Sequence, residues 1–222
     1  MSGSLLSGGL RSSYDRVARA YAAHVAGELA GKPADRRLLD ELAARAGGGV
    51  VGDLGCGPGH VAAYLAERGV PVLGVDLSPG MLAQAPRGLP VVAADLRALP
   101  LADGVLSAAA AFYSLIHLPP GTEVGTLAEV RRVVRPGGVL LAAVHIGTEV
   151  RHLDEWWGMP VSVDFRFFEV AELTGWLAEA GWAVEEVVER EHYPGVEVET
   201  SRAYAVAVRP GSGGTRRGSG RP

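Results

Sequence analysis

Three glycines at alternate positions interrupt the segment VVGDLGCGPGHVAAYL, which covers residues 50–65. Gly55, Gly57 and Gly59 follow an apolar run and precede a helical pattern. Glycine permits positive φ angles and lets a ligand approach the main chain closely. The N-terminus of the next helix presents free N–H groups, which favour a polar or anionic ligand. The turn therefore predicts a ligand site at the end of a strand.

Two acidic residues end the strands that we expect next along the chain. Asp76 closes the run PVLGV, 23 residues after Asp53, and Asp95 closes VVAA. An open parallel sheet binds ligands at the carboxyl ends of its strands, so both carboxylates should lie near the glycine turn. Asp76 could accept both hydroxyls of a ribose, and Asp95 an adenine amino group. The spacing GxGxG differs from the GxGxxG of dinucleotide sites and favours a nucleoside with an amino-acid tail.

Ordinary structural roles compete with these interpretations. Asp76 could cap the next helix, although Ser78, directly before Pro79, is the better N-cap. Asp95 could be a turn residue, and the glycines could form only a tight turn. Cys56 is the single cysteine and fits best as a small filler of this turn rather than a nucleophile. One cysteine excludes an intramolecular disulfide and is typical of a reducing compartment, so we expect a cytoplasmic protein.

Apolar strands alternate with helices from residue 50 onward. Strands are expected near residues 50–54, 72–75, 89–93, 105–113, 139–144, 183–189 and 203–208, and helices near 60–67, 79–85, 123–134 and 170–180. Strands that are apolar on both faces and separated by helices predict a parallel sheet covered on both sides. The first 47 residues show helical spacing throughout. The aromatic-rich segment 147–168 breaks the alternation and is expected to cover the site.

The composition indicates a globular chain of 222 residues, because 48% of them are apolar. The net charge of −4 gives no basic excess, so we expect no nucleic-acid partner. The longest apolar run, about 105–116, is shorter than the ~20 residues that span a bilayer, and no signal peptide is expected. Residues 210–222 lack anything to bury and are expected to be disordered. The oligomeric state stays open.

Five motifs in order resemble those of class I S-adenosylmethionine-dependent methyltransferases of the small-molecule group: VVGDLGCGPGHVAAYL, VLGVDLSPGML, VVAADLRALPL, AAFYSLIHLPP and VVRPGGVLLAAV. The resemblance covers roughly residues 14–210. It implies an α/β, Rossmann-like, doubly wound sheet of seven strands whose last strand is antiparallel. It further implies one domain, with a helical lid at 1–47, a methyltransferase region at 48–209 and a substrate-side insertion at 147–168.

The resemblance also implies a site for S-adenosylmethionine, whose product is S-adenosylhomocysteine. The glycines would line the methionine part, Asp76 would hold the ribose, and Asp95 would meet the edge of the adenine. The full set of cofactor-binding residues that it implies is Tyr21, Asp53, Gly55, Cys56, Gly57, Gly59, Asp76, Leu77, Met81, Ala94, Asp95, Leu96 and Tyr113.

The methyl group of a sulfonium is already activated, so transfer is an in-line displacement in which alignment alone can supply ~7–11 kcal/mol. A base helps only if the acceptor must lose a proton, and a neutral histidine suits that role near pH 7. His117 and His145 are the candidate bases, because they follow the fourth and fifth expected strands. His117 could instead be a structural or cofactor-side residue.

Further residues at the same sheet edge are candidates for holding the acceptor. Arg202 begins the last strand, and its guanidinium could bind a carboxylate or phosphate bidentately; a surface salt bridge is the alternative. The candidate substrate-binding residues are Tyr14, Trp156, Trp157, His192 and Arg202. The two tryptophans could equally dock the insertion onto the core. No metal is expected, because the histidines come from separate strands without paired ligands.

The sequence therefore predicts a methyltransferase that acts on an O or N atom of a small organic acceptor. A regulatory protein that binds S-adenosylmethionine without turnover is a second hypothesis. A nicotinamide-dependent oxidoreductase is a third, which fits an acidic second strand but not the GxGxG spacing.

Overall fold

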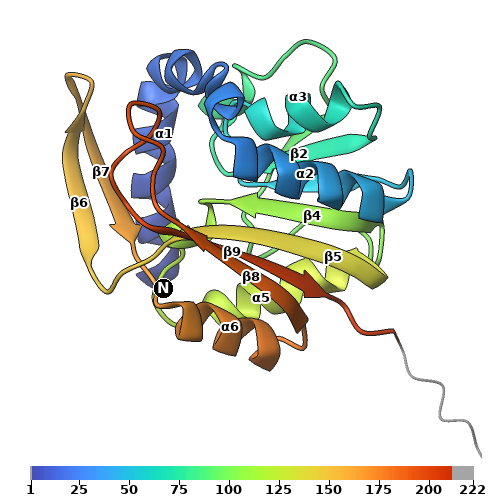
Figure 1. Ribbon diagram of the computed structural model, residues 1–222. Helices are drawn as coiled ribbons and strands as arrows, with labels where there is room; N and C mark the ends of the chain where they lie inside the picture. Colours follow the sequence, from blue (N-terminus) through green and yellow to red (C-terminus); the bar gives the residue numbers. More distant parts are fainter. Residues whose placement is uncertain (1, 212–222) are drawn as a thin grey trace, which may run out of the picture.

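A seven-stranded sheet forms the centre of the structure, a computed structural model that describes residues 2–211. The strand order is β3-β2-β1-β4-β5-β9-β8 (Figure 1). The strands are β1 Val51–Leu54, β2 Val72–Asp76, β3 Val91–Ala93, β4 Leu106–Phe112, β5 Val134–His145, β8 Ala183–Arg190 and β9 Arg202–Val208. The first five pair in parallel, and β9 runs antiparallel to both β5 and β8. The predicted sheet with its antiparallel last strand is confirmed.

Helices cover both faces of this sheet. On one face, α2 Pro33–Ala46 and α3 His60–Ala66 pack in one apolar cluster with Ala108 and Ala110 of β4. On the other, α5 Glu123–Val133 and α6 Val170–Glu179 pack in a second cluster with Ala109 and Ala111. Because successive residues of a strand face opposite sides, the alanine run of β4 gives small side chains to both layers. The chain therefore buries its central strand between two layers of helix.

A lid stands at the carboxyl edge of the parallel strands. It consists of α1 Ser2–Val25 and a hairpin of β6 Val150–Trp156 and β7 Met159–Arg166 (Figure 1). The hairpin turn has positive φ at Trp157 (53°) and Gly158 (75°), as a two-residue turn with the twist of its strands requires. The expectation that segment 147–168 lies over the site is refined here, because its hairpin packs against α1.

Polar contacts fasten α1 to both of its neighbours. The Ser162 N–H on β7 donates to Ser13 Oγ at 3.0 Å. Asp15 Oδ1 accepts from Ser78 Oγ at 2.6 Å and from the Gly80 N–H at 2.8 Å, which ties α1 to the short helix α4 Pro79–Leu82. A small apolar cluster that includes Val17 and Met81 fills the space between them. The helix and the hairpin therefore form one cover.

Two points concern the ends of the chain and the membrane. The segment expected to be disordered, 210–222, lies outside the described residues from 212 onward. Within the described part of the chain, no helix combines the length and the apolar character needed to cross a bilayer.

Candidate active site

The glycine turn joins β1 to α3 and is held against β2. The N–H groups of Gly55 and Cys56 both donate to the Val75 carbonyl, at 2.7 and 2.9 Å. The φ angles of Gly55, Gly57 and Gly59 are 79°, 54° and 78°, which L side chains rarely adopt. The sequence pattern correctly predicted a turn that depends on positive φ.

The three glycines differ in what a side chain would meet. A Cβ at Gly55 would stand 2.2 Å from Ser114 Cβ, and one at Gly59 would stand 2.8 Å from Leu89 Cδ2. Packing of the protein on itself therefore requires glycine at position 55, whereas at Gly59 the near atom is the flexible end of Leu89 and the positive φ is the stronger demand. A Cβ at Gly57 would meet only Tyr21 Cε1, at 3.9 Å. Of the three, Gly57 is the one at which a side chain would enter open space.

Asp76 lies at the end of β2 with its carboxylate beside this open main chain. Its Oδ2 accepts from the Gly57 N–H and its Oδ1 from the Ser78 N–H, each at 2.8 Å. Burial is the main cause of a raised pKa at Asp76. A carboxylate oxygen can accept more than one hydrogen bond, so both oxygens of Asp76 can still accept a hydrogen bond from a ligand. The side-chain N-cap of α4 is Ser78, which accepts from the Met81 N–H at 3.1 Å.

A cavity of about 510 Å³ opens at the carboxyl edge of β1, β2 and β4, beside α1. Ten of the thirteen expected cofactor-binding residues line it: Tyr21, Gly55, Cys56, Gly57, Asp76, Leu77, Met81, Asp95, Leu96 and Tyr113. Tyr14 and His117, expected on the acceptor side, line it as well. The order of strands in the sheet therefore brings together residues from four of the five sequence motifs, and α1 adds Tyr14 and Tyr21.

Three expected cofactor residues lie away from the cavity wall. Asp53 is 1% exposed, accepts from the Ala62 N–H at 2.9 Å in the first turn of α3, and has its pKa raised to about 7 by burial. Gly59 packs toward Leu89, as described above. Ala94 donates its N–H to the Asp76 carbonyl at 2.9 Å. The expectation of direct contact is corrected for these three residues, which shape the turn and the sheet edge.

Ion pairing limits what Asp95 can bind, and burial limits the reactivity of Cys56. Arg97 donates hydrogen bonds to Asp95 through Nε and Nη2, with Nη2 2.6 Å from Oδ2. This pairing lowers the pKa of Asp95. Cys56 is 2% exposed, and burial raises the pKa of its thiol well above the ordinary value. Cys56 is thus the small filler that the sequence suggested and has no thiolate to act as a nucleophile.

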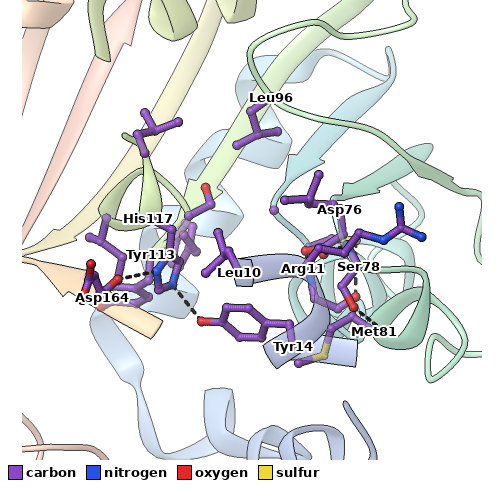
Figure 2. Close-up of a pocket in the computed structure, with 18 of the residues that line it drawn as sticks. Leu10, Arg11, Tyr14, Asp76, Ser78, Met81, Leu96, Tyr113, His117 and Asp164 are labelled. Atoms are coloured by element: carbon purple, nitrogen blue, oxygen red, sulfur yellow. Dashed lines mark hydrogen bonds between the residues drawn. The ribbon is translucent and has the colours of Figure 1, made fainter. Parts of the chain in front are cut away.

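His117 joins the lid to the sheet. Figure 2 shows its ring between Asp164 and Tyr14, with hydrogen bonds to both. The Asp164 carbonyl can only accept, so Nδ1, at 2.8 Å, carries the proton and donates. Nε2 is then the acceptor, and the Tyr14 hydroxyl donates to it at 2.7 Å. Burial lowers the pKa of His117 to about 4, which keeps the ring neutral.

This geometry predicts that His117 does not titrate between pH 8 and 5.5. In an NMR titration we expect its ring signals, assigned by their loss in His117→Gln, to stay constant, whereas His152 titrates above its ordinary pKa because Asp164 and Asp154 accept from it. The unfolded chain binds this proton near pH 6.5. The free energy of unfolding should therefore fall as the pH decreases from about 6.5 to 4. A His117 midpoint near 6.5 would contradict this assignment.

The second candidate base lies behind the cavity wall. His145 is stacked between the rings of Tyr113 and Phe167, at centroid distances of 4.8 and 5.2 Å, and its Nδ1 lies 2.9 Å from Thr200 Oγ1. Burial and the nearby Arg202 lower its pKa to about 3. The structure thus corrects the proposal of His145 as the base, because its ring does not line the cavity.

Arg202 is a buried structural cation, which corrects its assignment as an acceptor anchor. Its side chain is 2% exposed, and its Nε lies 3.3 Å from Glu197 Oε2. The guanidinium also donates hydrogen bonds to the carbonyls of Thr200 and Val198. His192 lies between β8 and β9, also away from the cavity wall. Neither residue lies where it could contact an acceptor in this cavity.

The two tryptophans dock the hairpin onto α1, which is close to the docking role named as the alternative. Trp156 and Trp157 stack at 4.9 Å, and Trp156 contacts the rings of Tyr14 and Tyr21 at 5.9 and 5.6 Å. They form a layer behind the tyrosines rather than the cavity wall itself. The expectation of an acceptor wall is therefore corrected.

Sequence reasoning missed several lining residues, among them Leu10, Arg11, Ser114, Asp164 and Arg166. Leu10 and Arg11 lie one helical turn before Tyr14, and that spacing could have identified them. Asp164 contributes a main-chain carbonyl to His117, for which a sequence carries no signal.

Comparisons with known proteins agree with this arrangement. A family model described as a methyltransferase domain matches residues 51–138. A demethylmenaquinone methyltransferase of Beutenbergia cavernae is 42% identical over 111 residues, which are 49% of this chain and 45% of that protein. A malonyl-[acyl-carrier protein] O-methyltransferase of Pseudescherichia vulneris is 34% identical over 66% of this chain and 57% of that protein. The chain spans about half the length of these curated relatives.

Solved structures share the fold over most of the chain. The [4+2]-cyclase SpnF superposes with a TM-score of 0.70 at 22% identity, covering 92% of this chain and 97% of that one. A 1,6-didemethyltoxoflavin-N1-methyltransferase of Burkholderia thailandensis, solved with S-adenosylhomocysteine, has a TM-score of 0.62 at 22% identity over 86% of this chain and 90% of that one. The sequence match over residues 51–138 and the sheet topology together show that the chain contains a methyltransferase domain with the fold of these solved structures.

Proposed function

We propose that this protein moves a methyl group from S-adenosylmethionine to an O or N atom of a small organic acceptor by in-line displacement. The observation that carries the proposal is the cavity. One part of its wall, with Gly57 and Asp76, could hold a nucleoside, and the cavity continues from there to Tyr14 and His117. A regulatory protein that only binds the cofactor has no need of a second, acceptor-side wall. No residue of the chain needs to be a nucleophile, since the bound sulfonium supplies an activated methyl group.

Features of the cavity fit this cofactor. The main chain at Gly57 is open to the cavity. A Cβ built there would have only Tyr21 Cε1, which also lines the cavity, within 4 Å. Asp76 has spare acceptor capacity for ribose hydroxyls, as argued above. Ser114 Oγ is buried beside the turn without a hydrogen-bond partner among the described residues, so a polar ligand group would satisfy it. Tyr21, Leu77 and Met81 would cover the bound cofactor and exclude water.

The acceptor is proposed only as a class. The named relatives are methyltransferases for demethylmenaquinone and for malonyl-[acyl-carrier protein], and a fold neighbour methylates N1 of 1,6-didemethyltoxoflavin. Another fold neighbour is named a [4+2]-cyclase, so the fold by itself does not fix the reaction. What favours a small acceptor here is the limited size of the cavity and its cover by α1 and the hairpin.

Calorimetry with S-adenosylhomocysteine tests the proposal, and Gly57→Ala sharpens it. We expect saturable binding to the wild type and none with NAD. The Cβ in Gly57→Ala should weaken the affinity at least tenfold, about 1.4 kcal/mol, because it occupies the space that the ligand would approach.

Gly47→Ala is a matched control. Gly47 has a similar φ of 59°, open surroundings and a position at the end of α2, away from the cavity. Both variants should lose about 1–2 kcal/mol of unfolding free energy through the left-handed backbone, but only Gly57→Ala should lose affinity. Absence of binding to the wild type, or equal affinity of the two variants, would count against the proposed function.

A further inference from the structure

The charges of the cavity wall disfavour an anionic acceptor. Five carboxylate residues and three arginines line the cavity: Glu28, Asp35, Asp76, Asp95, Asp164, Arg11, Arg97 and Arg166. Glu28, Asp35 and Asp95 are neutralised by Lys32, Arg190 and Arg97, respectively, whereas Asp76 has no ion pair among the described residues. Its carboxylate stabilises a bound cation such as a sulfonium and repels an anion. The wall therefore suits a positively charged donor together with an acceptor that carries no negative charge.

All three arginines of the wall already have acidic partners. Arg97 is bound to Asp95 through two nitrogens, as described above. Arg166 donates to Glu123 Oε1 at 2.5 Å and to the Leu118 carbonyl at 3.0 Å. Arg11 Nε lies 3.7 Å from Asp15 Oδ2. An acceptor carboxylate or phosphate would have to compete with these carboxylates for every guanidinium of the wall.

The surroundings of His117 are apolar and aromatic. Ile116 and Leu118 flank it along the chain and line the cavity, and Leu10 lies across from it in Figure 2. The ring of Tyr14, which lines the cavity, is 5.4 Å from that of His117, and the ring of Phe165, which lies behind the lining, is 5.1 Å away. Aromatic rings pack with one another at such distances in edge-to-face or offset geometry. This part of the cavity therefore suits a flat, largely apolar molecule.

His117 Nε2 is a proton acceptor in this apolar region. Nδ1 is committed to the Asp164 carbonyl, so the tautomer is fixed, and Nε2 faces a hydroxyl group in the structure, that of Tyr14. A ligand hydroxyl could replace the Tyr14 hydroxyl as donor without any change at His117. The protein's own phenol thus marks the kind of group that this nitrogen accepts.

We propose that the acceptor is an uncharged, largely apolar ring compound with a phenolic or enolic hydroxyl, and that His117 Nε2 takes the proton of that hydroxyl during methyl transfer. The inference rests on the proposed function. A lone pair of the hydroxyl oxygen forms the bond to the methyl carbon, and the electron pair of the C–S bond returns to sulfur. The O–H pair stays on oxygen, and the proton moves to Nε2. The products are a methyl ether, S-adenosylhomocysteine and protonated His117, which then loses the proton to water.

A weakly basic histidine is sufficient for this step. The hydroxyl proton becomes strongly acidic as the oxygen bonds to the methyl carbon, so the transfer to His117 is favourable late in the reaction. The low basicity also keeps His117 unprotonated and ready at neutral pH.

The test uses three probes that share one ring: 1-naphthol, 1-naphthylamine and 1-naphthoate. We expect 1-naphthol to be methylated at least tenfold faster than the other two and to bind the protein saturated with S-adenosylhomocysteine at least tenfold more tightly than 1-naphthoate, as measured by calorimetry. In His117→Gln, kcat for 1-naphthol should fall at least 100-fold, whereas the calorimetric affinities for 1-naphthol and for S-adenosylhomocysteine should stay within threefold.

His24→Gln is the control, because His24 is exposed on α1 and does not line the cavity; its kcat should be unchanged. Preference for the amine or the carboxylate, full turnover in His117→Gln, or no turnover of any of the three probes would overturn the inference. If S-adenosylhomocysteine binds while these results appear, the proposed function stands and only the acceptor class is wrong.

Discussion

Replacing Asp76 with alanine is expected to weaken the affinity for S-adenosylhomocysteine on the order of 100-fold. The ribose of the ligand carries two hydroxyls, and hydrogen bonds to a charged acceptor are each worth about 1.5–3 kcal/mol. The carboxylate already accepts from Gly57 and Ser78, so it stands in a fixed orientation before the ligand arrives. Calorimetry at pH 7.5 measures the loss, and circular dichroism shows whether the fold is kept.

Asp95→Ala is the matched control for this prediction. Asp95 lies at the end of the neighbouring strand and lines the same cavity, but its two oxygens already bind Arg97. Its loss should weaken the affinity less than about tenfold, because a paired carboxylate gives up one hydrogen bond to gain another. Asp76→Asn keeps the shape of the side chain without its charge. Its affinity for S-adenosylhomocysteine should lie between those of the wild type and Asp76→Ala. An effect at Asp95 that equals the effect at Asp76 would contradict the assignment of the ribose to Asp76.

The sequence predicted the fold well because the fold depends on local patterns. The apolar runs that become β1, β4 and β9 were located to within one or two residues, and the turn glycines show the positive φ that their spacing implied. Gly55 and Gly57, which follow β1, and Asp76, which ends β2, could be expected at one site for the same reason. Their place in the cavity follows from topology alone, once the strands are parallel and adjacent.

The acceptor side could not be predicted in the same way. His117 follows β4, His145 ends β5 and Arg202 begins the antiparallel strand β9, so topology places all three at one edge of the sheet. What separates them is the direction of each side chain and its partners: His117 faces the cavity, whereas His145 is stacked between two rings. These contacts join residues more than 20 positions apart in the chain, and 103 positions apart for Tyr14 with His117, and no periodicity encodes them.

Arg202 belongs to a buried network whose charges cancel. The network joins three carboxylates to three cations: Glu28, Asp35, Glu197, Lys32, Arg190 and Arg202. Lys32 is the only lysine of the chain and is 5% exposed. Glu197 occupies the centre, because it lies within ion-pair distance of all three cations, with Oε2 at 3.3 Å from both Lys32 Nζ and Arg202 Nε. Burial alone would raise the pKa of Glu197, but the hydrogen bonds from Arg190 and the nearby cations lower it.

Glu197→Gln should therefore lower the free energy of unfolding by about 3–5 kcal/mol at pH 7, since it leaves three buried cations with only two carboxylates. Urea denaturation measures the change. The loss should shrink as the pH falls through the lowered pKa of Glu197, because the wild type then also loses this charge. Glu41→Gln is the control: Glu41 pairs with Arg37 in the open, with side-chain exposures of 48% and 50%, and should cost no more than about 0.5 kcal/mol. A change at Glu197 as small as that at Glu41 would show that the network does not hold the β8–β9 segment in place, and that Arg202 is free to serve another role.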